Sequence, residues 1–596
     1  MGIIRRNLII VITGLLFIGV LIVPMSGGLA QTGDPTATPL AGTLVKPTKV
    51  PVTATAEVSL ASARVNRSGI ETLQNEGVLR VGTRFNVPPF AWLDEGGDLA
   101  GYEADIVRAI AEDIGVEVEF VQTTAETELR LLVAGEVDLL IGQQIHTKQA
   151  EEFVEFTHTY YYNQQRMVIR EADQGTYSTV SSLANQRIGV VAGSRGEEAF
   201  NLWMAQTGTG MELVRYLSQD SALDALSAGD VNGVVGELDD LKRAGRLQMS
   251  LIPEPIRQDP YAIAIRRHDV NLRNLLNRSL QRLMAAGTIP TLGEQWFPNE
   301  EINYAAFIPR YRNLEDDQRT VDDFPPDMPI PDRSVLAKIR AGETLRVAGL
   351  DIAEGGLYYE GFLDPINRAI VEEMARRWGV GVTFLPDTYG QGVDLVANGE
   401  VDMAIGVRAR WDGADRADYS VPYHYSGDRI LTLEGSRFGS FNDFRMGSWI
   451  GYFQDAPQNK EYLESLDRSY SVYRFLNSEE AVEEIFETRD IDALFGDTIR
   501  LLAFMDRYDN IPWTLQPELL GPEPFQPLVI GVPRNDADFL TLVNWTLGEM
   551  FADGTLERLW SENYDTEQWL AYGIDVPHWI PDWPGIRDFL NERGYE

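Results

Sequence analysis

The sequence predicts an α/β protein made of two tandem copies of one domain, each folded into two α/β lobes. Short apolar runs typical of buried strands alternate with amphipathic helical segments along the chain. Six motifs recur in the same order at offsets of about 260–267 residues, a period that indicates duplicated domains. The 596 residues exceed one core, and a copy of about 220 residues is large enough to divide into two lobes.

The first 30 residues have the layout of a secretory signal peptide. Arg5 and Arg6 precede an apolar run over residues 8–23, and small residues lead to a cleavage candidate at Ala30. The run also has roughly the minimum length that spans a bilayer, so an uncleaved N-terminal membrane anchor is the alternative. Residues 31–68 are rich in Thr, Pro and Ala and are expected to form an extended linker. Both interpretations export the chain to the periplasmic or extracellular face of the membrane.

Composition excludes several classes of function. The 51 Lys and Arg against 90 Asp and Glu give a net charge of −39, which argues against nucleic-acid partners and anionic lipid surfaces. The chain has no Cys, which excludes disulfides, a thiol nucleophile and a lipid-bearing cysteine. Five His without paired spacing do not suggest a metal site. No nucleotide-binding or hydrolase motif is present, so we expect no cofactor and no enzyme activity.

Each copy is defined by the same order of motifs. The first, expected over residues 69–298, opens with LRVGTRFNVPPFAW and GYEADIVRAIAEDIGVEVEFV, which predict a buried strand, a Pro-bearing loop, a helix and a second strand. The later motifs LVAGEVDLLIG and VNGVVGELDDL return as LVANGEVDMAIG and IDALFGDTIRL. The second copy is expected over residues 334–565. An acidic, Pro-rich linker (299–333) separates the copies, and an aromatic tail (566–596) follows.

These motifs resemble the bacterial extracellular solute-binding proteins of family 3, the polar amino-acid-binding type of ABC transporters. The matching stretches include LRVGTRFNVPPF, GYEADIVRAIAEDIG, RIGVVAGSRGEEAF and MAAGTIPTLGEQWF. The resemblance implies a type II periplasmic-binding-protein (Venus-flytrap) fold in two tandem copies. The first copy would cross between its lobes near Tyr162 to Arg166 and again near Asp259 to Ala264. Ligand would bind in the cleft between lobes, which close by a hinge motion.

The resemblance implies an exported binding protein of an ABC-type uptake system. Each domain would trap a small polar solute, an amino acid or a related compound, and present its closed form to a membrane permease. One alternative is a cell-surface sensing or scaffolding module without a transport role. A second alternative is an enzyme of dehydratase type, because this fold also hosts such enzymes.

The family's ligand chemistry maps onto residues of the first copy. Glu237 stands at the acidic position that pairs with a ligand's amino group; the alternative is a solvated acid at a strand end. The Gly193–Ser194 turn matches the loop whose N–H groups bind a ligand carboxylate at a helix start. Phe90 and Trp92 stand where the family presents an aromatic wall, with core packing as the alternative.

Two positions depart from the family pattern. Thr147 is kept, but Ala150 replaces the Arg that grips the ligand carboxylate, and Arg84 stands where the family has Asp. One hypothesis makes Arg84 the new anion anchor. The rival hypothesis is that this cleft takes another polar solute or none. Gln143 and Gln144 are expected to hydrogen-bond ligand under either hypothesis.

The second copy is more divergent. Asp497 stands where Glu237 stands in the first copy, and Tyr358 is a candidate cleft aromatic. Arg408 and Trp411 suggest fork and stacking contacts with an anionic or planar ligand. The alternative is surface pairing of three arginines with nearby acids: Arg408, Arg410 and Arg416 with Asp412, Asp415 and Asp418. The second cleft would then bind a different ligand or serve as a docking body.

Overall fold

The structure, a computed structural model, describes residues 67–298, 320–326, 328–350, 363–385, 391–454, 456–466, 469–516 and 526–564, with a few single residues between 302 and 314. The predicted signal peptide or anchor, most of the N-terminal linker, Tyr358 and the aromatic tail lie outside the described residues. Within the described residues, no helix has both the length and the apolar character needed to cross a bilayer.

The first repeat is built on one nine-stranded sheet of order β5-β1-β6-β12-β7-β10-β8-β9, with β11 paired to β7. Its strands are β1 (Val78–Thr83), β5 (Glu117–Gln122), β6 (Leu139–Leu140), β7 (Val154–Arg170), β8 (Arg187–Val191), β9 (Glu212–Tyr216), β10 (Gly233–Glu237), β11 (Met249–Leu251) and β12 (Arg257–Arg266). A small second sheet contains β2 (Asn86–Val87), β3 (Ala91–Leu93) and β4 (Leu99–Ala100).

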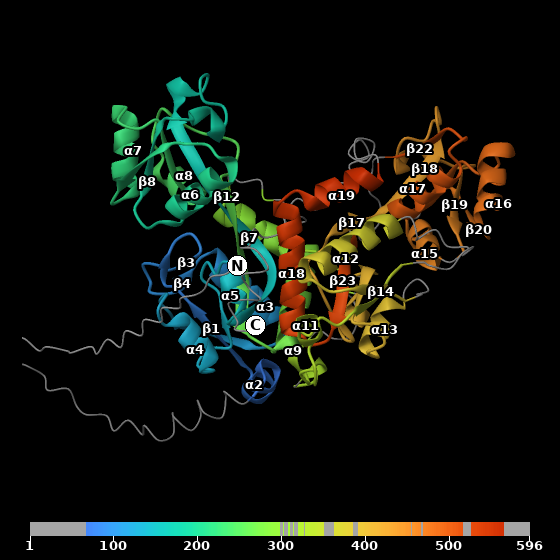
Figure 1. Ribbon diagram of the computed structural model, residues 1–596, viewed down its shortest axis with the longest axis horizontal. Helices are drawn as coiled ribbons and strands as arrows, with labels where there is room; N and C mark the ends of the chain where they lie inside the picture. The colour runs from blue at the N-terminus through green and yellow to red at the C-terminus, as the bar shows by residue number, and fades with distance from the viewer. Residues whose placement is uncertain are drawn as a thin grey trace, which may run out of the picture. The chain divides into compact units, whose positions relative to one another are not determined.

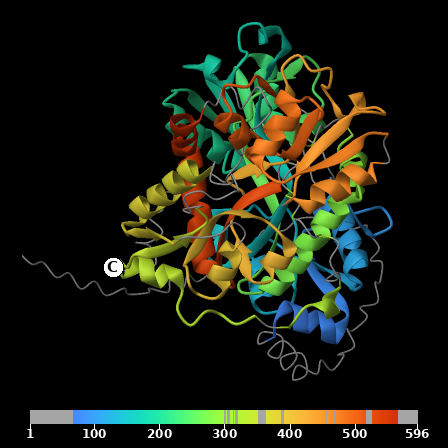
Figure 2. The same ribbon diagram turned by 90° about the vertical axis from the view of Figure 1, so that its right-hand side faces the viewer.

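Strands β7 and β12 join the two lobes of this repeat. β7 is 17 residues long, so its first half pairs within the first lobe and its second half pairs with β10 and β11 in the second. The two strands run antiparallel from one lobe to the other (Figures 1 and 2). Tyr162 lies opposite Pro260, and Gln165 lies opposite Arg257. The two predicted crossing segments therefore pair with each other.

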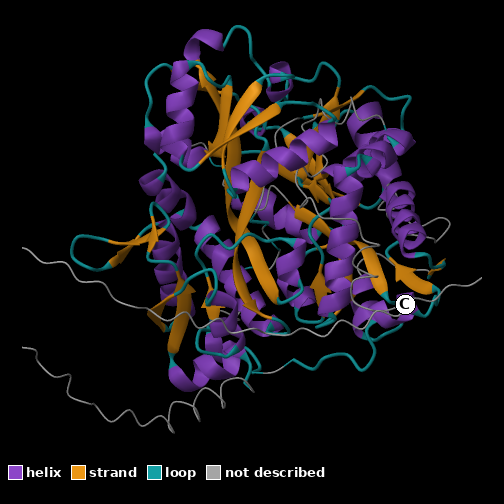
Figure 3. Ribbon diagram, turned by 60° about the vertical axis from the view of Figure 1, so that its left-hand side comes forward, coloured by secondary structure: helices purple, strands orange, loops and turns teal. Residues whose placement is uncertain are grey.

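Helices cover the strands on both sides (Figure 3). In the first repeat they are α2 (Gly69–Glu76), α3 (Tyr102–Ile114), α4 (Glu128–Val133), α5 (Lys148–Glu151), α6 (Arg195–Thr207), α7 (Gln219–Ala228), α8 (Leu238–Ala244), α9 (Val270–Ala285) and α10 (Thr288–Trp296). Gly101, directly before α3, has φ 129°, and a Cβ there would lie 2.1 Å from the carbonyl oxygen of Phe90. Glycine at this position therefore seats the Pro-bearing loop against the start of α3.

The second repeat has two separate sheets, one in each lobe. The first lobe contains β13 (Leu345–Ala348), β14 (Val382–Phe384), β15 (Met403–Arg408), β16 (Ala417–Tyr419), β17 (His424–Ser426) and β23 (Gln526–Pro533). The second contains β18 (Asp428–Leu433), β19 (Trp449–Phe453), β20 (Ser471–Phe475), β21 (Ala493–Asp497) and β22 (Trp513–Leu515). Its helices are α11 (Val335–Arg340), α12 (Asp364–Trp378), α13 (Gly392–Ala397), α14 (Trp411–Ala414), α15 (Pro457–Ser465), α16 (Ser478–Val482), α17 (Thr498–Arg507), α18 (Ala537–Ala552) and α19 (Thr555–Asn563). The predicted α/β lobes are confirmed in both repeats.

The apolar cores of the two repeats are connected differently. In the first repeat, each buried cluster stays within one lobe: the largest and two smaller ones lie in the first lobe, and two lie in the second. In the second repeat, one cluster of buried side chains runs through both lobes. It includes Ile370 and Leu528 of the first lobe together with Phe475 and Phe504 of the second. The two lobes of the second repeat are therefore packed on each other.

Equivalent residues of the two repeats meet where the first lobes contact each other. The guanidinium of Arg278 lies 4.6 Å from the ring centre of Trp411, and the ammonium of Lys148 lies 4.9 Å from that of Trp545. Arg278 is the ninth residue of α9, and Trp545 is the ninth residue of the equivalent helix α18. Lys148 is the first residue of α5, and Trp411 is the first residue of the equivalent helix α14. The junction is therefore pseudo-twofold, with cation and ring exchanged between the repeats.

The turns before α9 and α18 meet at the centre of this junction. His268 Nδ1 lies 2.9 Å from Asn535 Oδ1, and both residues stand two positions before their helix. On one side Arg267 binds Asp538 at 2.8 Å, and on the other Arg534 donates to Asn271 at 2.9 Å. These contacts connect the first lobe of one repeat directly to the first lobe of the other.

Candidate functional site

Glu237 lies at the hinge of the first repeat. It is the last residue of β10 and directly precedes α8. Its Oε2 accepts a 2.9 Å hydrogen bond from the Asn163 amide, which also donates to the Tyr261 hydroxyl at 2.7 Å. Burial raises the pKa of the Glu237 carboxyl, and the nearby charge of Arg195 opposes that rise. The carboxylate is thus held from β7 while remaining about a quarter exposed.

Arg195 is the cation beside Glu237. It is the first residue of α6, and its Nη1 lies 3.1 Å from the Tyr261 hydroxyl and 3.9 Å from Glu237 Oε1. The motif VVAGSRG contains this residue, but sequence reasoning singled out only the preceding Ser194. Arg195 directly follows the helix-capping Ser194, shortly after the end of β8, and this position is the sequence signal that could have identified it. The arginine fork beside a carboxylate matches the two charges of a zwitterion.

The predicted N–H donors of the Gly193–Ser194 turn have acceptors within the turn itself. The Gly193 N–H donates to the carboxylate of Glu197 at 2.8 Å, and the Ser194 N–H donates to the Val191 carbonyl at 3.1 Å. The Ser194 hydroxyl caps α6 by accepting from the Glu197 N–H at 3.2 Å. The side chain of Glu197 therefore already supplies an anion to this turn.

Arg84 and Gln144 converge on one carboxylate in the first lobe. Arg84 Nη2 lies 3.3 Å from Glu128 Oε2, and the Gln144 amide donates to the same oxygen at 3.1 Å. Gln143 contributes its backbone, because its N–H donates to Glu103 Oε1 at 2.7 Å. The structure thus brings these three predicted residues to one edge of the first lobe.

Glu103 is a buried carboxyl behind this edge. Its Oε1 also accepts from the Tyr160 hydroxyl at 2.5 Å, whereas its Oε2 has no hydrogen-bond partner among the described residues. Burial raises the pKa of Glu103 to about 7, and the charges of Arg84 and Arg195 act in the opposite direction. A cation from each lobe, Arg84 and Arg195, is therefore close enough to Glu103 to favour its charged form.

Glu103 should make the stability of the protein depend on pH. Its folded pKa lies above its unfolded value, so its contribution is fully present below about pH 4.5 and is lost as pH rises through about 7. The wild-type protein should lose roughly 1–3 kcal/mol of unfolding free energy between about pH 5 and about pH 8 as Glu103 ionises. Glu103→Gln keeps an acceptor but cannot ionise, so this loss should be absent from the variant. Urea unfolding of both proteins across this range measures the difference. Glu112→Gln, at an exposed position of the same helix, should leave the profile unchanged, and an unchanged profile in Glu103→Gln would contradict the assignment.

The second cleft pairs its acid with its own arginine. Arg408 Nη1 lies 2.7 Å from Asp497 Oδ2, and the Ser426 hydroxyl donates to the same oxygen at 2.8 Å. Of the other surface pairs expected, Arg410 binds Asp412 at 3.0 Å, whereas Arg416 pairs with Asp394. Arg408 therefore does not pair at the surface; it connects the ends of β15 and β21, which belong to different lobes.

Both repeats match the same family of known proteins. The family model of the bacterial extracellular solute-binding proteins, family 3, matches residues 79–299 and again residues 354–565. The chain belongs to this family. The L-cystine-binding protein TcyJ of Escherichia coli K12 is 22% identical over 232 residues, which cover 38% of this chain and 85% of that protein. The L-arginine-binding protein of Pseudomonas aeruginosa is 26% identical over 238 residues, covering 38% of this chain and 91% of that protein.

Among solved structures, this family 3 chain is similar to an ancestral arginine-binding protein bound to arginine. The two are 27% identical with a TM-score of 0.31, and the match covers 37% of this chain and 99% of that one.

Two residues predicted to line the clefts of this family 3 protein are buried in packed regions instead. Phe90 is 1% exposed and packs against Tyr161, Tyr261 and Phe297, so the core-packing alternative describes it. Trp411 is also 1% exposed, and its indole N–H donates to Gln281 at the junction between the repeats. Its prediction as a stacking surface is therefore corrected. The Thr147 hydroxyl caps α5 by accepting from the Ala150 N–H at 3.2 Å, and its contact with ligand stays a prediction.

Trp92 keeps a partly exposed face. Its ring packs edge-on against Trp296 with centroids 5.3 Å apart, so α10 fixes one side of the indole. As a ligand-facing aromatic of the family 3 protein it stays a prediction.

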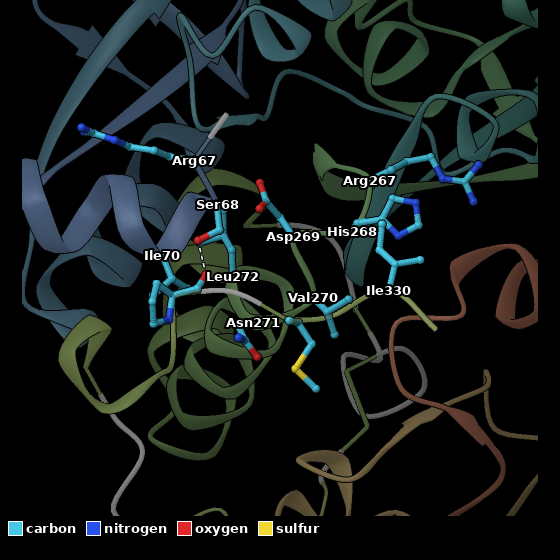
Figure 4. Close-up of a pocket in the computed structure, with 12 residues that line it drawn as sticks. Arg67, Ser68, Ile70, Arg267, His268, Asp269, Val270, Asn271, Leu272 and Ile330 are labelled. Carbon is cyan, nitrogen blue, oxygen red and sulfur yellow. Dashed lines mark hydrogen bonds between the residues drawn. The ribbon is translucent and has the colours of Figure 1, made fainter. Parts of the chain in front are cut away.

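A separate cavity of about 360 Å³ lies beside α2 and the start of α9, away from both clefts (Figure 4). Its central acid, Asp269, already accepts from the Gly69 N–H at 2.9 Å and pairs with Arg266 at 3.0 Å. Arg67 extends away from Asp269 and His268 in this view. The cavity therefore has the character of a gap between packed segments.

Proposed function

We propose that the first repeat binds a small zwitterionic solute, an amino acid or related compound, between its lobes and presents it to the membrane permease of an ABC-type uptake system. One observation carries the proposal. At the hinge, Arg195 and Glu237 place opposite charges 3.9 Å apart, both partly exposed. A ligand with an ammonium and a carboxylate would replace this loose contact with two charge-assisted hydrogen bonds.

The residues divide the work of binding between the lobes. Glu237 would accept from the ligand ammonium, and Arg195 would bind its carboxylate from the second lobe. Arg84 would add a second cation from the first lobe, supported by Glu128 and Gln144. Because ligand then contacts both lobes, it favours the closed form, which is the form a permease would recognise.

The relatives support the chemical class of the solute. Two of them are named for the amino acids cystine and arginine, and each matches about the length of one repeat. The lost carboxylate-binding arginine at Ala150 would be replaced by Arg195 and Arg84. The proposed location is the outer side of the membrane, with the N-terminal segment as signal peptide or anchor.

Removing the charge of Glu237 tests this assignment. A thermal-shift screen of the full exported chain against amino acids, organic acids, polyamines and sugars identifies a solute, because binding to the folded state raises the melting temperature. Glu237→Gln should then weaken binding of an aminated solute about 30–1,000-fold, measured by calorimetry, because the ammonium loses its charged partner. Glu212→Gln, an exposed acid of the same lobe, is the matched control. Equal affinity in both variants would remove Glu237 from the site.

A further inference from the structure

The strand-end acids of the two repeats differ in what they bind. Asp497 and Glu237 are each the last residue of the equivalent strand, β21 or β10. Asp497 Oδ1 caps α17 by accepting from the Ile499 N–H at 3.0 Å, whereas the side chain of Glu237 does not cap α8. The shorter side chain of Asp497 therefore binds the first turn of α17.

The second oxygen of Asp497 is used by the chain itself. Oδ2 accepts from Arg408 at 2.7 Å and from the Ser426 hydroxyl at 2.8 Å, and Arg408 also donates to the side chain of Gln526 at 3.1 Å. The Arg408 and Asp497 side chains are both 12% exposed. Asp497 and Gln526 thus bind the guanidinium of Arg408, and the Ser426 hydroxyl holds the carboxylate oxygen that receives it.

Strand pairing explains why only the second repeat has this contact. Arg408 lies opposite Leu528 on β23. In the first repeat the matching position, opposite Tyr261, is Ile145, which carries no charge. Glu237 is therefore left without a comparable cation from the first lobe.

Three further features agree with a second cleft that closes without solute. The ion pair of Arg408 and Asp497 joins the ends of β15 and β21, which lie in different sheets and different lobes. Among the described residues, one apolar cluster continues through both lobes of the second repeat, whereas the clusters of the first repeat do not. In addition, α15 begins at Pro457, which has no N–H, and the preceding Ala456 has no side chain that could cap it, so this turn offers a carboxylate fewer donors than its counterpart before α6.

We propose that Arg408 acts as a tethered ligand: its guanidinium occupies a cation-binding site formed by Asp497 and Gln526, with Ser426 supporting the carboxylate, and holds the second repeat closed in the absence of solute. The tandem protein then binds solute in the first cleft alone. The statement about solute rests on the proposed function, whereas the occupied guanidinium site does not.

Removing the Arg408 side chain should empty the cation-binding site at Asp497, and a small guanidinium ion in solution should then bind there. Arg408→Ala in the full chain should lower the melting temperature of the second repeat by about 5–10 °C, because it leaves a largely buried carboxylate without its cation. Methylguanidinium chloride at about 10 mM should recover a substantial part of that loss, compared with an equal concentration of sodium chloride. Arg410→Ala, which removes a surface arginine two residues away, should show neither the loss nor the recovery.

A double-mutant cycle supplies the second measurement. Arg408→Ala combined with Asp497→Asn should destabilise the protein less than the sum of the two single changes. The proposal is overturned if the changes add, or if methylguanidinium raises the melting temperature equally in the Arg408 and Arg410 variants. Neither result depends on the solute of the first cleft, so failure here is distinct from failure of the Glu237 test.

Discussion

Arg273→Met should destabilise the protein by about 3–5 kcal/mol. Arg273 lies on α9 and bridges the repeats, with Nη1 2.9 Å from Glu155 of the first and Nη2 2.6 Å from Asp418 of the second. All three side chains are buried. Burial alone lowers the pKa of Arg273, but the two carboxylates outweigh it and raise the pKa. Methionine fills similar space but leaves two buried acids without this shared cation.

Urea unfolding measures this loss, and an exposed arginine provides the control. Arg187→Met removes a surface pair with Glu212 and should cost less than about 1 kcal/mol. A loss of similar size in both variants would mean that the bridge between repeats contributes no more than a surface ion pair.

Trp545→Ala should cost about 3–5 kcal/mol through the same junction. Trp545 is 1% exposed on α18; Lys148 lies over its ring, and its indole N–H donates to Glu151 of the first repeat. Alanine would remove the ring contact and the hydrogen bond and leave a cavity between the repeats.

Trp545→Phe separates these contributions. Phenylalanine keeps an aromatic face beneath Lys148 but has no N–H for Glu151, so we expect a smaller loss of about 1–3 kcal/mol in urea unfolding. If phenylalanine were as damaging as alanine, the hydrogen bond and not ring packing would account for the contact.

Features set by local sequence were predictable. The recurring order of motifs gives two copies, and apolar periodicity gives the strands and helices of each. Glu237 and Asp497 were placed at equivalent strand ends because each follows a short buried run within its motif. The hinge segments followed from the family resemblance, and they pair as β7 and β12.

Features set by distant partners were not predictable in the same way. In the sequence Trp411 lies among arginines near a predicted cleft. In the structure it packs in the junction between the repeats, against Arg278, which is 133 residues away. Arg408 has three acids close in sequence, yet it binds Asp497, which is 89 residues away. Arg195 lies within the VVAGSRG motif, but only the folded chain brings it to Tyr261 and Glu237. Charge pairing depends on which strand ends meet, and a single sequence does not record that.

The number of solute molecules bound per chain shows whether one cleft or both are open to solute. Native mass spectrometry of the full chain, with the strongest solute from the thermal-shift screen, counts them. We expect one solute per chain, absent in Glu237→Gln and retained in Asp497→Asn. Two solutes per chain, or one that survives Glu237→Gln and disappears in Asp497→Asn, would contradict this expectation.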